Sequence, residues 1–535
     1  MPYTARTRGF RFLAIALGAS LVHAVLIALP GVSAERVYAN YGPIGRYITV
    51  ESLATYAETG ELTEELEGYS RYLTPEQLDQ LRNGLLVSAD LDVVAVSQFL
   101  YTPQGEAILA GLGEVVQTAG RQNGALAIRG AVIVAAADPD GGLNVLNVLK
   151  HFATPGVRVD LGRFARVARA AIAEINQTRE ATAQIREQFT QSVTGPIGER
   201  SLTSQSTLAS AGPARWDKQV FNQALLPTDL YLPEGQNLPL VVISHGVGGN
   251  RATLAYLAEH LASHGFAVVV VEHRGSSESQ LTDLLSGQAR EAIKPEEMID
   301  RPVNIQQLLD QLEAMAQRDP TLRNRVDFQR VGALGQSFGA YTSLALAGAA
   351  VDLDRLGESC PPQIAQLNLS LLLQCLVPSL PQPLPPLGDE RVRAAIAINP
   401  FSSAIFGPEG MANITVPTML ISASADTVTP ALAEQIRPFS WLTSPERYLM
   451  IMEGGTHFST IFDPQAVEAV AVPERAIGPN PELAQRYVKA MSLAFFKTHL
   501  AAAEDYRQYL EPSYAATLSQ PDIPISLVRE LTLEE

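Results

Sequence analysis

Short apolar runs recur along the C-terminal two thirds of the chain, each broken by glycine, proline or small polar residues. These runs lie at residues 238–244, 331–334, 394–398, 418–421 and 448–451. A continuous apolar run of this length is typical of a strand that is buried on both faces of a sheet. The small apolar segment at 340–347 follows the second run and predicts a helix packed on that sheet. The pattern therefore predicts an α/β fold, with a mostly parallel sheet flanked by helices, over residues 216–505.

Residues 35–195 follow a different pattern. Thr63-Glu64-Glu65-Leu66 and Thr74-Pro75-Glu76 have the composition of helix starts, the second with proline at the first helical position. The alanine-rich, charge-spaced stretch at 161–189 predicts one long helix, and no strands joined by hairpin turns are evident. We therefore expect a separate N-terminal helical domain. A linker at 196–215, rich in Ser, Thr, Ala and Gly, and a C-terminal tail at 506–535 complete the predicted organisation.

Basic residues followed by a long apolar run open the chain. Arg6, Arg8 and Arg11 precede an uncharged run at 12–30, and small residues end the segment at Ala34. This order is that of an export signal with cleavage after Ala34. The run is also close to the span of a bilayer, so an uncleaved membrane anchor over 1–34 is the alternative. The protein is expected in the periplasm or outside the cell.

Composition narrows the set of partners. The chain has 535 residues, 46% hydrophobic and 18% charged, so it is long enough for two or more domains. A formal net charge of −17 argues against nucleic acid as a partner and against charge-driven binding to anionic membranes. Membrane association is therefore expected only through the N-terminal segment. The sequence predicts neither a metal nor an organic cofactor, and it leaves the oligomeric state open.

A candidate nucleophile lies between the second apolar run and the helix behind it, in Gly335-Gln336-Ser337-Phe338-Gly339. On a tight strand-to-helix turn, Gly335 and Gly339 would relieve clashes and the serine hydroxyl would be exposed over the end of the sheet. The N-terminus of the following helix would then point at the reacting group. This setting predicts that Ser337 is a nucleophile.

A serine nucleophile needs a base and an acid to orient it, and in this kind of fold both follow the serine in the chain. Of the eight histidines, only His457 and His499 lie downstream of Ser337. His457 is in a glycine-loosened loop after a strand, whereas His499 is on a predicted terminal helix, so His457 is the predicted base. Asp426 ends a strand 31 residues before His457 and is the predicted acid. A helix-capping role for Asp426 is the alternative.

Backbone donors for an oxyanion are predicted after the first apolar run, which continues as His245-Gly246-Val247-Gly248-Gly249. Gly246 and Gly248 would let backbone amides turn toward a ligand. The amides of Val247 and Phe338 are the predicted oxyanion hole. His245 is interpreted as a structural hydrogen-bonding residue rather than a second base.

These motifs resemble the platelet-activating-factor acetylhydrolases and the dienelactone-hydrolase-like esterases of the α/β-hydrolase superfamily. The resemblance rests on residues 245–248, 261–274 and 335–339, with 300–305, where Pro302 is expected to start a helix, as a further shared segment. It covers about residues 227–500. It implies an α/β-hydrolase fold and hydrolysis of carboxylic esters without a cofactor. The N-terminal part resembles a domain found ahead of hydrolase domains in some photosynthetic bacteria, to which no chemistry is attached.

The chain departs from the animal acetylhydrolases at one position. In that group the acid follows the strand after the nucleophile helix, whereas here that strand ends in Asn399. An amide cannot stabilise an imidazolium as a carboxylate does. The acid is therefore expected on the next strand, at Asp426, as in dienelactone-type enzymes. Glu453 and Asp463, which are nearer to His457 in sequence, rank below it.

An insertion at 351–390 interrupts the alternation of strands and helices. It contains an apolar segment at 367–373, a proline-rich stretch and the only two cysteines of the chain, Cys360 and Cys375. In an exported protein these cysteines are expected to form a disulfide, with two buried thiols as the alternative. The position of the insertion after the nucleophile helix predicts a cap over the active site. Packing on the side of the sheet is the alternative.

Two classes of function follow from these residues. The first is a serine carboxylester hydrolase that acts through an acyl-enzyme on lipophilic or short-chain esters, with lipase or phospholipase A2-like acetylhydrolase action as a variant. The second is a non-catalytic exported scaffold that retains the hydrolase fold. A complete Ser–Asp–His set favours the first class, whose expected partner is a small-molecule ester.

Overall fold

The computed structural model describes residues 33–41, 44–89, 91–193, 208–222, 225–320, 322–360, 368–461 and 474–533. The chain divides into two compact units, Met1–Arg166 and Val167–Glu535. The predicted export signal or anchor lies outside the described residues except for its last two positions, and Ala34 is buried in the core of the first unit. Among the described residues, no helix is long and apolar enough to cross a membrane.

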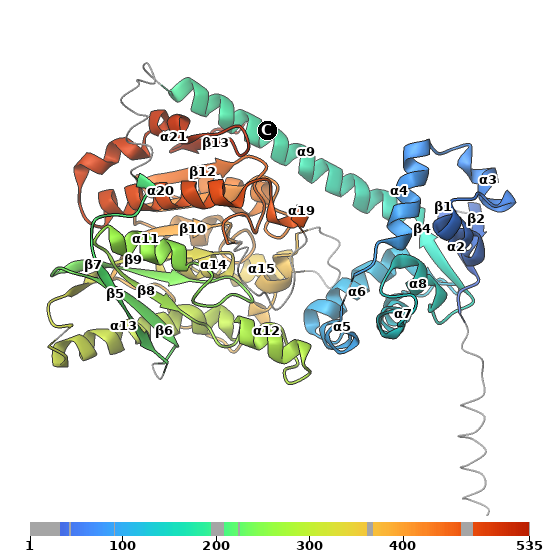
Figure 1. The fold of residues 1–535 in the computed structure, drawn as a ribbon, viewed down its shortest axis with the longest axis horizontal. Helices are drawn as coiled ribbons and strands as arrows, with labels where there is room; N and C mark the ends of the chain where they lie inside the picture. The colour runs from blue at the N-terminus through green and yellow to red at the C-terminus, as the bar shows by residue number, and fades with distance from the viewer. Residues whose placement is uncertain are drawn as a thin grey trace, which may run out of the picture. The chain divides into compact units, whose positions relative to one another are not determined.

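The first unit combines helices with a small four-stranded sheet (Figure 1). Its elements are β1 (Arg36–Tyr41), β2 (Ile44–Thr49), α2 (Val50–Thr59), α3 (Glu64–Ser70), α4 (Pro75–Leu86), α5 (Val93–Leu100), α6 (Pro103–Val115), β3 (Val116–Thr118), α7 (Ala125–Ala137), α8 (Val145–Lys150), β4 (Gly156–Asp160) and the start of α9 (Leu161–Ser192). The predicted helix starts are confirmed, because Thr63 caps α3 and Thr74 caps α4 through their side chains.

The sheet of the first unit was not predicted, since the residue pattern indicated only helices there. Its strand order is β2-β1-β4-β3, and β1 pairs antiparallel with β2 and parallel with β4. The pairing of Arg36 with Gly156 joins segments that are distant in sequence. Several of these strand residues are only half-buried, so no apolar run marks them. The local pattern of apolar and polar residues therefore did not predict these strands.

The second unit is built on a nine-stranded sheet of order β13-β12-β11-β10-β9-β7-β8-β6-β5. The strands are β5 (Trp216–Phe221), β6 (Thr228–Pro233), β7 (Leu238–Ser244), β8 (Ala267–Val271), β9 (Val326–Gln336), β10 (Val392–Ile398), β11 (Thr418–Ala423), β12 (Arg447–Met452) and β13 (Ile525–Val528). β7 to β12 run parallel to one another, while β5, β6 and β13 pair antiparallel at the edges. Each predicted apolar run is a strand, and the predicted α/β fold is confirmed.

Helices cover this sheet (Figure 1). They are α11 (Ala255–Ser263), α12 (Glu278–Leu285), α13 (Glu297–Arg318), α14 (Phe338–Leu346), α15 (Leu353–Ser359), α16 (Leu371–Gln374), α17 (Gly407–Ala412), α18 (Arg437–Trp441), α19 (Glu474–Ile477), α20 (Pro481–His499) and α21 (Pro512–Leu518), with short turns η1 (Val377–Ser379), η2 (Leu432–Ile436) and η3 (Glu504–Leu510). Every residue of α14 is buried, and this helix contacts β7, β9 and β10. The predicted helix behind the nucleophile is therefore at the centre of the unit.

Two segments that were expected outside the sheet domain belong to its core. The later turns of α9 bury Ala181, Ile185 and Phe189 with the sheet, so the division between the units falls inside this helix rather than near residue 195. The predicted tail at 506–535 contains α21 and β13, and β13 pairs with β12 and is fully buried. β13 adds to the sheet because the free edge of β12 would otherwise present unpaired backbone groups.

The predicted linker at 196–215 is described only from residue 208 onward, and this part packs on the second unit. Leu208 is buried in the main core. The amide of Gly212 donates to Ser263 Oγ at 2.8 Å, and the amide of Ala214 donates to the Ser263 carbonyl. These contacts place residues 208–215 with the sheet domain.

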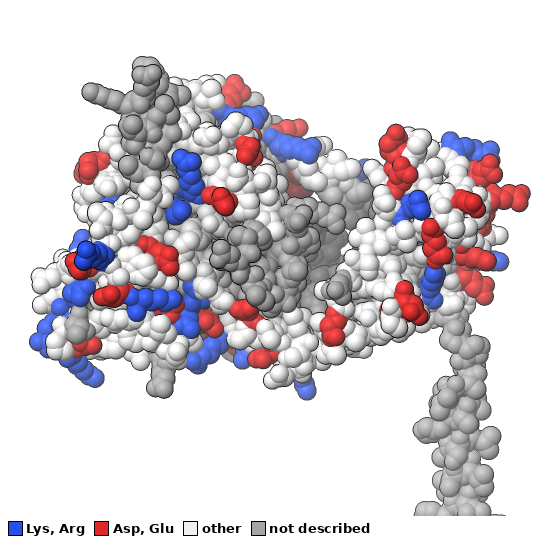
Figure 2. Space-filling view, viewed as in Figure 1, with Lys and Arg blue, Asp and Glu red and all other residues white. Residues whose placement is uncertain are grey.

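Charged side chains of both signs are mixed over the face drawn in Figure 2, where the described residues form no broad field of Lys and Arg. Several basic side chains are used in ion pairs. Arg391 pairs with Asp389 and Asp310, and Glu446 receives both Arg507 and Arg529. On this face Lys and Arg therefore lie among acidic side chains rather than in a patch of their own.

Candidate active site

Ser337 lies at the turn between β9 and α14, in a backbone conformation that side chains rarely adopt. Its φ is 56° and its ψ is −117°. The residues two positions before and after Ser337 must be glycine, since a Cβ on Gly335 would lie 2.1 Å from the Gly339 carbonyl oxygen. A Cβ on Gly339 would lie 1.9 Å from the carbonyl oxygen of Ser244. Strain of this kind persists only where the surrounding structure holds it, and it is concentrated at functional sites.

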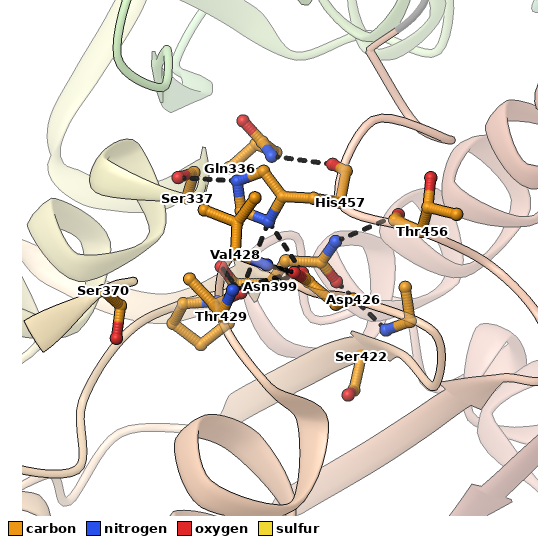
Figure 3. Close-up of polar contacts among 12 residues, drawn as sticks. Gln336, Ser337, Ser370, Asn399, Ser422, Asp426, Val428, Thr429, Thr456 and His457 are labelled. Carbon is orange, nitrogen blue, oxygen red and sulfur yellow. Dashed lines mark hydrogen bonds and ion pairs between the residues drawn. The ribbon is translucent and has the colours of Figure 1, made fainter. Parts of the chain in front are cut away.

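The imidazole of His457 lies between Ser337 and Asp426 (Figure 3). Its Nε2 is 2.9 Å from Ser337 Oγ, and its Nδ1 is 2.7 Å from Asp426 Oδ2. When Nδ1–H donates to the carboxylate, Nε2 is left as an acceptor for the serine proton. All three residues are buried, with 5–6% of their surface exposed. The structure therefore brings together the three residues that the sequence nominated from separate strand ends.

The turn that follows β11 fixes the carboxylate of Asp426. Its Oδ1 accepts hydrogen bonds from the amides of Val428 and Thr429, both at 2.8 Å. Its Oδ2 accepts a third bond from Thr429 Oγ1 at 2.8 Å. These turn contacts orient the carboxylate, and Oδ2 also faces the imidazole. Asp426 thus combines a local turn role with a contact to His457.

Two side chains that the sequence analysis did not assign to the site hold the loop of His457. Gln336 Nε2 donates to the His457 carbonyl at 3.1 Å. Asn399 Nδ2 reaches the Thr456 carbonyl at 3.5 Å, while its Oδ1 accepts from the amide of Ala423 at 3.1 Å (Figure 3). Asn399 therefore links the loop of the histidine to the end of β11. Only the pairing of β9, β10 and β11 brings these groups together.

The loop after β7 places backbone amides beside Ser337. A Cβ on Gly246 would lie 3.3 Å from the Cβ of Ser337 and 2.6 Å from Gln336 Oε1, so the loop approaches as closely as glycine allows. Gly248 has a φ of +70°, which also favours glycine. Within the described part of the chain, neither Val247 nor Phe338 has an acceptor for its amide. Val247 and Phe338 therefore remain the candidate oxyanion donors.

The other histidines that the sequence raised have structural contacts. His245 Nε2 accepts from the amide of His273 at 3.0 Å, and its Nδ1 lies 2.6 Å from the Gly246 carbonyl. Burial lowers the pKa of His245 to about 3, so the ring is neutral at pH 7 and donates through Nδ1. His499 ends α20, with Nε2 3.1 Å from the Tyr448 hydroxyl. His499 therefore lies on the predicted terminal helix, where the residue is partly exposed.

Comparisons with known proteins cover both units. Residues 219–314 match the family described as platelet-activating factor acetylhydrolase, isoform II. Residues 33–160 match a family described as an alpha/beta hydrolase of unknown function. A protein named Cutinase 1 from Thermobifida cellulosilytica is 24% identical over 287 residues, which cover 53% of this chain and 77% of that protein. The chain is an α/β hydrolase, similar to proteins named cutinase.

Two further relatives fit this assignment. A protein named Cutinase from Thermobifida fusca is 24% identical to the hydrolase over 287 residues, covering 53% of this chain and 67% of the relative. A platelet-activating factor acetylhydrolase from Cavia porcellus is 32% identical over 95 residues, which cover 17% of this chain and 19% of that protein. The family resemblance expected from the motifs is thereby confirmed.

The described residues of the α/β hydrolase contain no group of three or more His, Cys, Asp or Glu side chains that could hold a metal ion. Of the two acids that ranked below Asp426, Glu453 is engaged elsewhere, because it pairs with Arg186 of α9 at 2.7 Å. Asp463 lies outside the described residues.

The insertion of the hydrolase lies against the loop that carries Asp426. Cys360 and Cys375 form the expected disulfide. The amide of Ser370 donates to the Val428 carbonyl at 3.1 Å, two residues beyond Asp426. The apolar segment predicted at 367–373 contains the start of helix α16, which begins at Leu371. Residue 367 lies outside the described residues.

A buried carboxylate that the sequence analysis missed joins the insertion to the sheet. Glu434 is 0% exposed and receives six hydrogen bonds. Three come from the insertion and three from the segment after β10: the donors are Asn368 Nδ2, Ser370 Oγ, Gln374 Nε2, Ser403 Oγ and the amides of Ser402 and Ser403. A lone glutamate in a helix pattern gives no local signal of such a role.

Replacing Glu434 with glutamine will lower the free energy of unfolding of the hydrolase by about 2–4 kcal/mol, because buried donors would face an amide group that donates. Unfolding in urea measures the change. Glu409, which is exposed on α17, is the matched control, and its replacement with glutamine will shift the free energy by about 0.5 kcal/mol or less. Equal effects of the two changes would contradict the assigned role.

Proposed function

We propose that the hydrolase is a serine esterase in which Ser337, His457 and Asp426 act as a catalytic triad. His457 accepts the Ser337 proton as Oγ attacks the ester carbonyl carbon, and Asp426 holds the imidazole in the required tautomer. His457 then returns the proton to the departing alcohol, and an acyl-enzyme remains. A water molecule, deprotonated by His457, then attacks the acyl carbonyl carbon, and His457 returns this proton to Ser337 Oγ as the acid is released. The observation that carries this proposal is the pair of hydrogen bonds from His457 to Ser337 and Asp426.

The oxyanion of each tetrahedral intermediate is stabilised by the amides of Val247 and Phe338. Support for this role is that both amides lack an acceptor among the described residues and flank the nucleophile. Phe338 is also the first residue of α14, so its amide belongs to the positive end of that helix. Donors fixed before the reaction stabilise developing charge without reorganisation.

Lipophilic or short-chain carboxylic esters are the proposed substrates. The similarity to proteins named cutinase covers about half of this chain. Val247, within the oxyanion loop, is 38% exposed and offers an apolar surface to an acyl or alcohol group. The insertion, placed against the Asp426 loop, is the proposed cap that limits substrate size. The match of residues 219–314 supports a second candidate, acetylhydrolase action on a phospholipid.

An exported location is part of the proposal, in the periplasm or outside the cell. It is supported by the order of basic, apolar and small residues at 1–34. A disulfide between Cys360 and Cys375 also fits an oxidising compartment.

Hydrolysis of p-nitrophenyl esters from acetate to palmitate by the purified protein tests the function, with the Ser337→Ala variant as the blank. We expect hydrolysis that depends on Ser337, with a maximum at one acyl length. A phosphatidylcholine with an sn-2 acetyl group, assayed in parallel, separates the second candidate from the first. Absence of Ser337-dependent hydrolysis with every ester would refute the proposal and favour the non-catalytic scaffold.

A further inference from the structure

A single arginine side chain contacts both segments that carry the proposed oxyanion donors. Arg301 lies on α13 and is 0% exposed, so it cannot touch a substrate from solvent. Its Nη1 donates to the His245 carbonyl at 2.7 Å, and its Nη2 reaches the Gly246 carbonyl at 3.5 Å. Its guanidinium carbon lies 3.9 Å from the centre of the Phe338 ring. One rigid group therefore reaches the residue before Val247 and the side chain of Phe338.

We propose that Arg301 is a positioning residue for the oxyanion hole, which it sets by holding the peptide between Gly246 and Val247. This inference rests on the proposed function and adds a residue to it. In a trans peptide the carbonyl and the amide point in opposite directions. Donors on the Gly246 carbonyl therefore turn the Val247 amide to the other side of the peptide plane, away from Arg301.

The Gly246 carbonyl has a second side-chain donor. His245 Nδ1 lies 2.6 Å from it, and His245 is itself held through the amide of His273. The amide of Gly248 donates to the Ser276 carbonyl at 2.9 Å and fixes the far side of the loop. The loop is thus held from several sides, while the Val247 amide has no acceptor among the described residues.

The charge of Arg301 is balanced inside the unit. Ser276 Oγ accepts from Arg301 Nη2 at 2.7 Å and donates to Glu297 Oε2 at 2.6 Å. Arg301 Nε is also 3.4 Å from Glu297 Oε2. Burial lowers the pKa of Arg301 to about 10, while the nearby carboxylate of Glu297 raises it. The guanidinium therefore stays charged at neutral pH. A planar fork with five donors reaches two carbonyls and stacks on a ring, which a lysine ammonium cannot do.

The helix that carries Arg301 is joined to the helix that follows Ser337 by a hydrogen bond, which the proline next to Arg301 makes possible. Pro302 was expected to start this helix, but α13 begins at Glu297, so that expectation is wrong. Inside a helix Pro302 leaves the carbonyl of Met298 without its usual donor. Tyr341 of α14 supplies one, since its hydroxyl donates to this carbonyl at 2.6 Å. Arg301 is therefore held in register with the helix that begins at Phe338.

The test is the Arg301→Met variant, compared with Arg391→Met. Arg391 is a largely buried, ion-paired arginine that precedes β10, at the opposite end of the sheet from Ser337. Active sites are counted by complete reaction with a fluorophosphonate, so kcat refers to folded enzyme. We expect Arg301→Met to lower kcat by roughly 10- to 100-fold with KM changed by less than about threefold. The loss is smaller than the ~10²–10³-fold effect of removing an oxyanion donor itself.

A reversible trifluoromethyl ketone gives a readout that a merely structural role would not change. Its hemiketal oxygen occupies the oxyanion position, so its inhibition constant should rise by the same factor as kcat/KM falls. Arg391→Met should change neither value per titrated site. Unchanged kcat and inhibition constant in Arg301→Met, or equal changes in both variants, would overturn the inference.

A second variant decides the question if Arg301→Met is not recovered folded. His245→Gln removes the other side-chain donor to the Gly246 carbonyl, and the same two quantities should change in parallel, by a smaller factor. Unaltered values there would also overturn the inference. Activity that persists in Ser337→Ala would instead refute the proposed function. Loss of activity in Ser337→Ala, with wild-type constants in Arg301→Met, would refute only the role of Arg301.

Discussion

Ser337→Ala will reduce kcat for p-nitrophenyl ester hydrolysis by on the order of 10⁵- to 10⁶-fold. The change removes the only hydroxyl that lies at hydrogen-bond distance from His457 Nε2 among the described residues. Without Oγ no acyl-enzyme forms, and residual hydrolysis comes from water and the oxyanion donors alone. Labelling by a fluorophosphonate probe should disappear together with the activity.

Ser343→Ala is the matched control for this variant. Ser343 is also buried, lies on the same helix α14 and donates to the Gly339 carbonyl at 3.0 Å, without contacting His457. Its replacement should leave both labelling and kcat within about threefold of wild type. Labelling that persists in Ser337→Ala would show that another residue is the nucleophile.

Asp426→Asn will lower kcat by roughly 10⁴-fold while leaving the protein folded. The amide oxygen can still accept the hydrogen bonds from Val428 and Thr429 that orient this side chain. The amide nitrogen would then face His457 Nδ1 as a donor. That contact favours the tautomer with the proton on Nε2, where it cannot accept the proton of Ser337. The kcat of titrated enzyme and a thermal unfolding curve measure the two effects.

Glu453→Gln is the control for Asp426→Asn, because Glu453 is nearer to His457 in sequence. Its side chain pairs with Arg186 instead, so kcat should stay within about threefold of wild type. Near-normal activity in Asp426→Asn combined with a large loss in Glu453→Gln would assign the acid to Glu453.

Local sequence was sufficient to predict the central strands and the turn at Ser337. Parallel strands buried on both faces need continuous apolar runs, and those runs are visible in the sequence. The turn needs glycine at 335 and 339, because any Cβ there would overlap a carbonyl oxygen. These requirements act within a few residues, so the residue types alone reveal them. The chain order of Ser337, Asp426 and His457 then limited the choice of base and acid.

Elements whose partners lie far along the chain could not be predicted in this way. β4 pairs with β1, and β13 completes the edge of the main sheet, although neither belongs to a conspicuous apolar run. The later turns of α9 likewise pack their apolar side chains against the sheet domain, which is formed by residues far along the chain. Each of these segments acquires its place only from a surface that the rest of the fold creates.

The sequence by itself determined the α/β core, the strained serine and its two candidate partners, since each is specified by local sterics and by strand order. The tertiary structure alone decided which polar side chains support them. Arg301, Asn399 and Glu434 act through backbone carbonyls, amides and hydroxyls of other segments. Buried polar groups need partners wherever the fold supplies them. No pattern of residue types along the chain encodes those partners, because they meet only when the sheet has assembled.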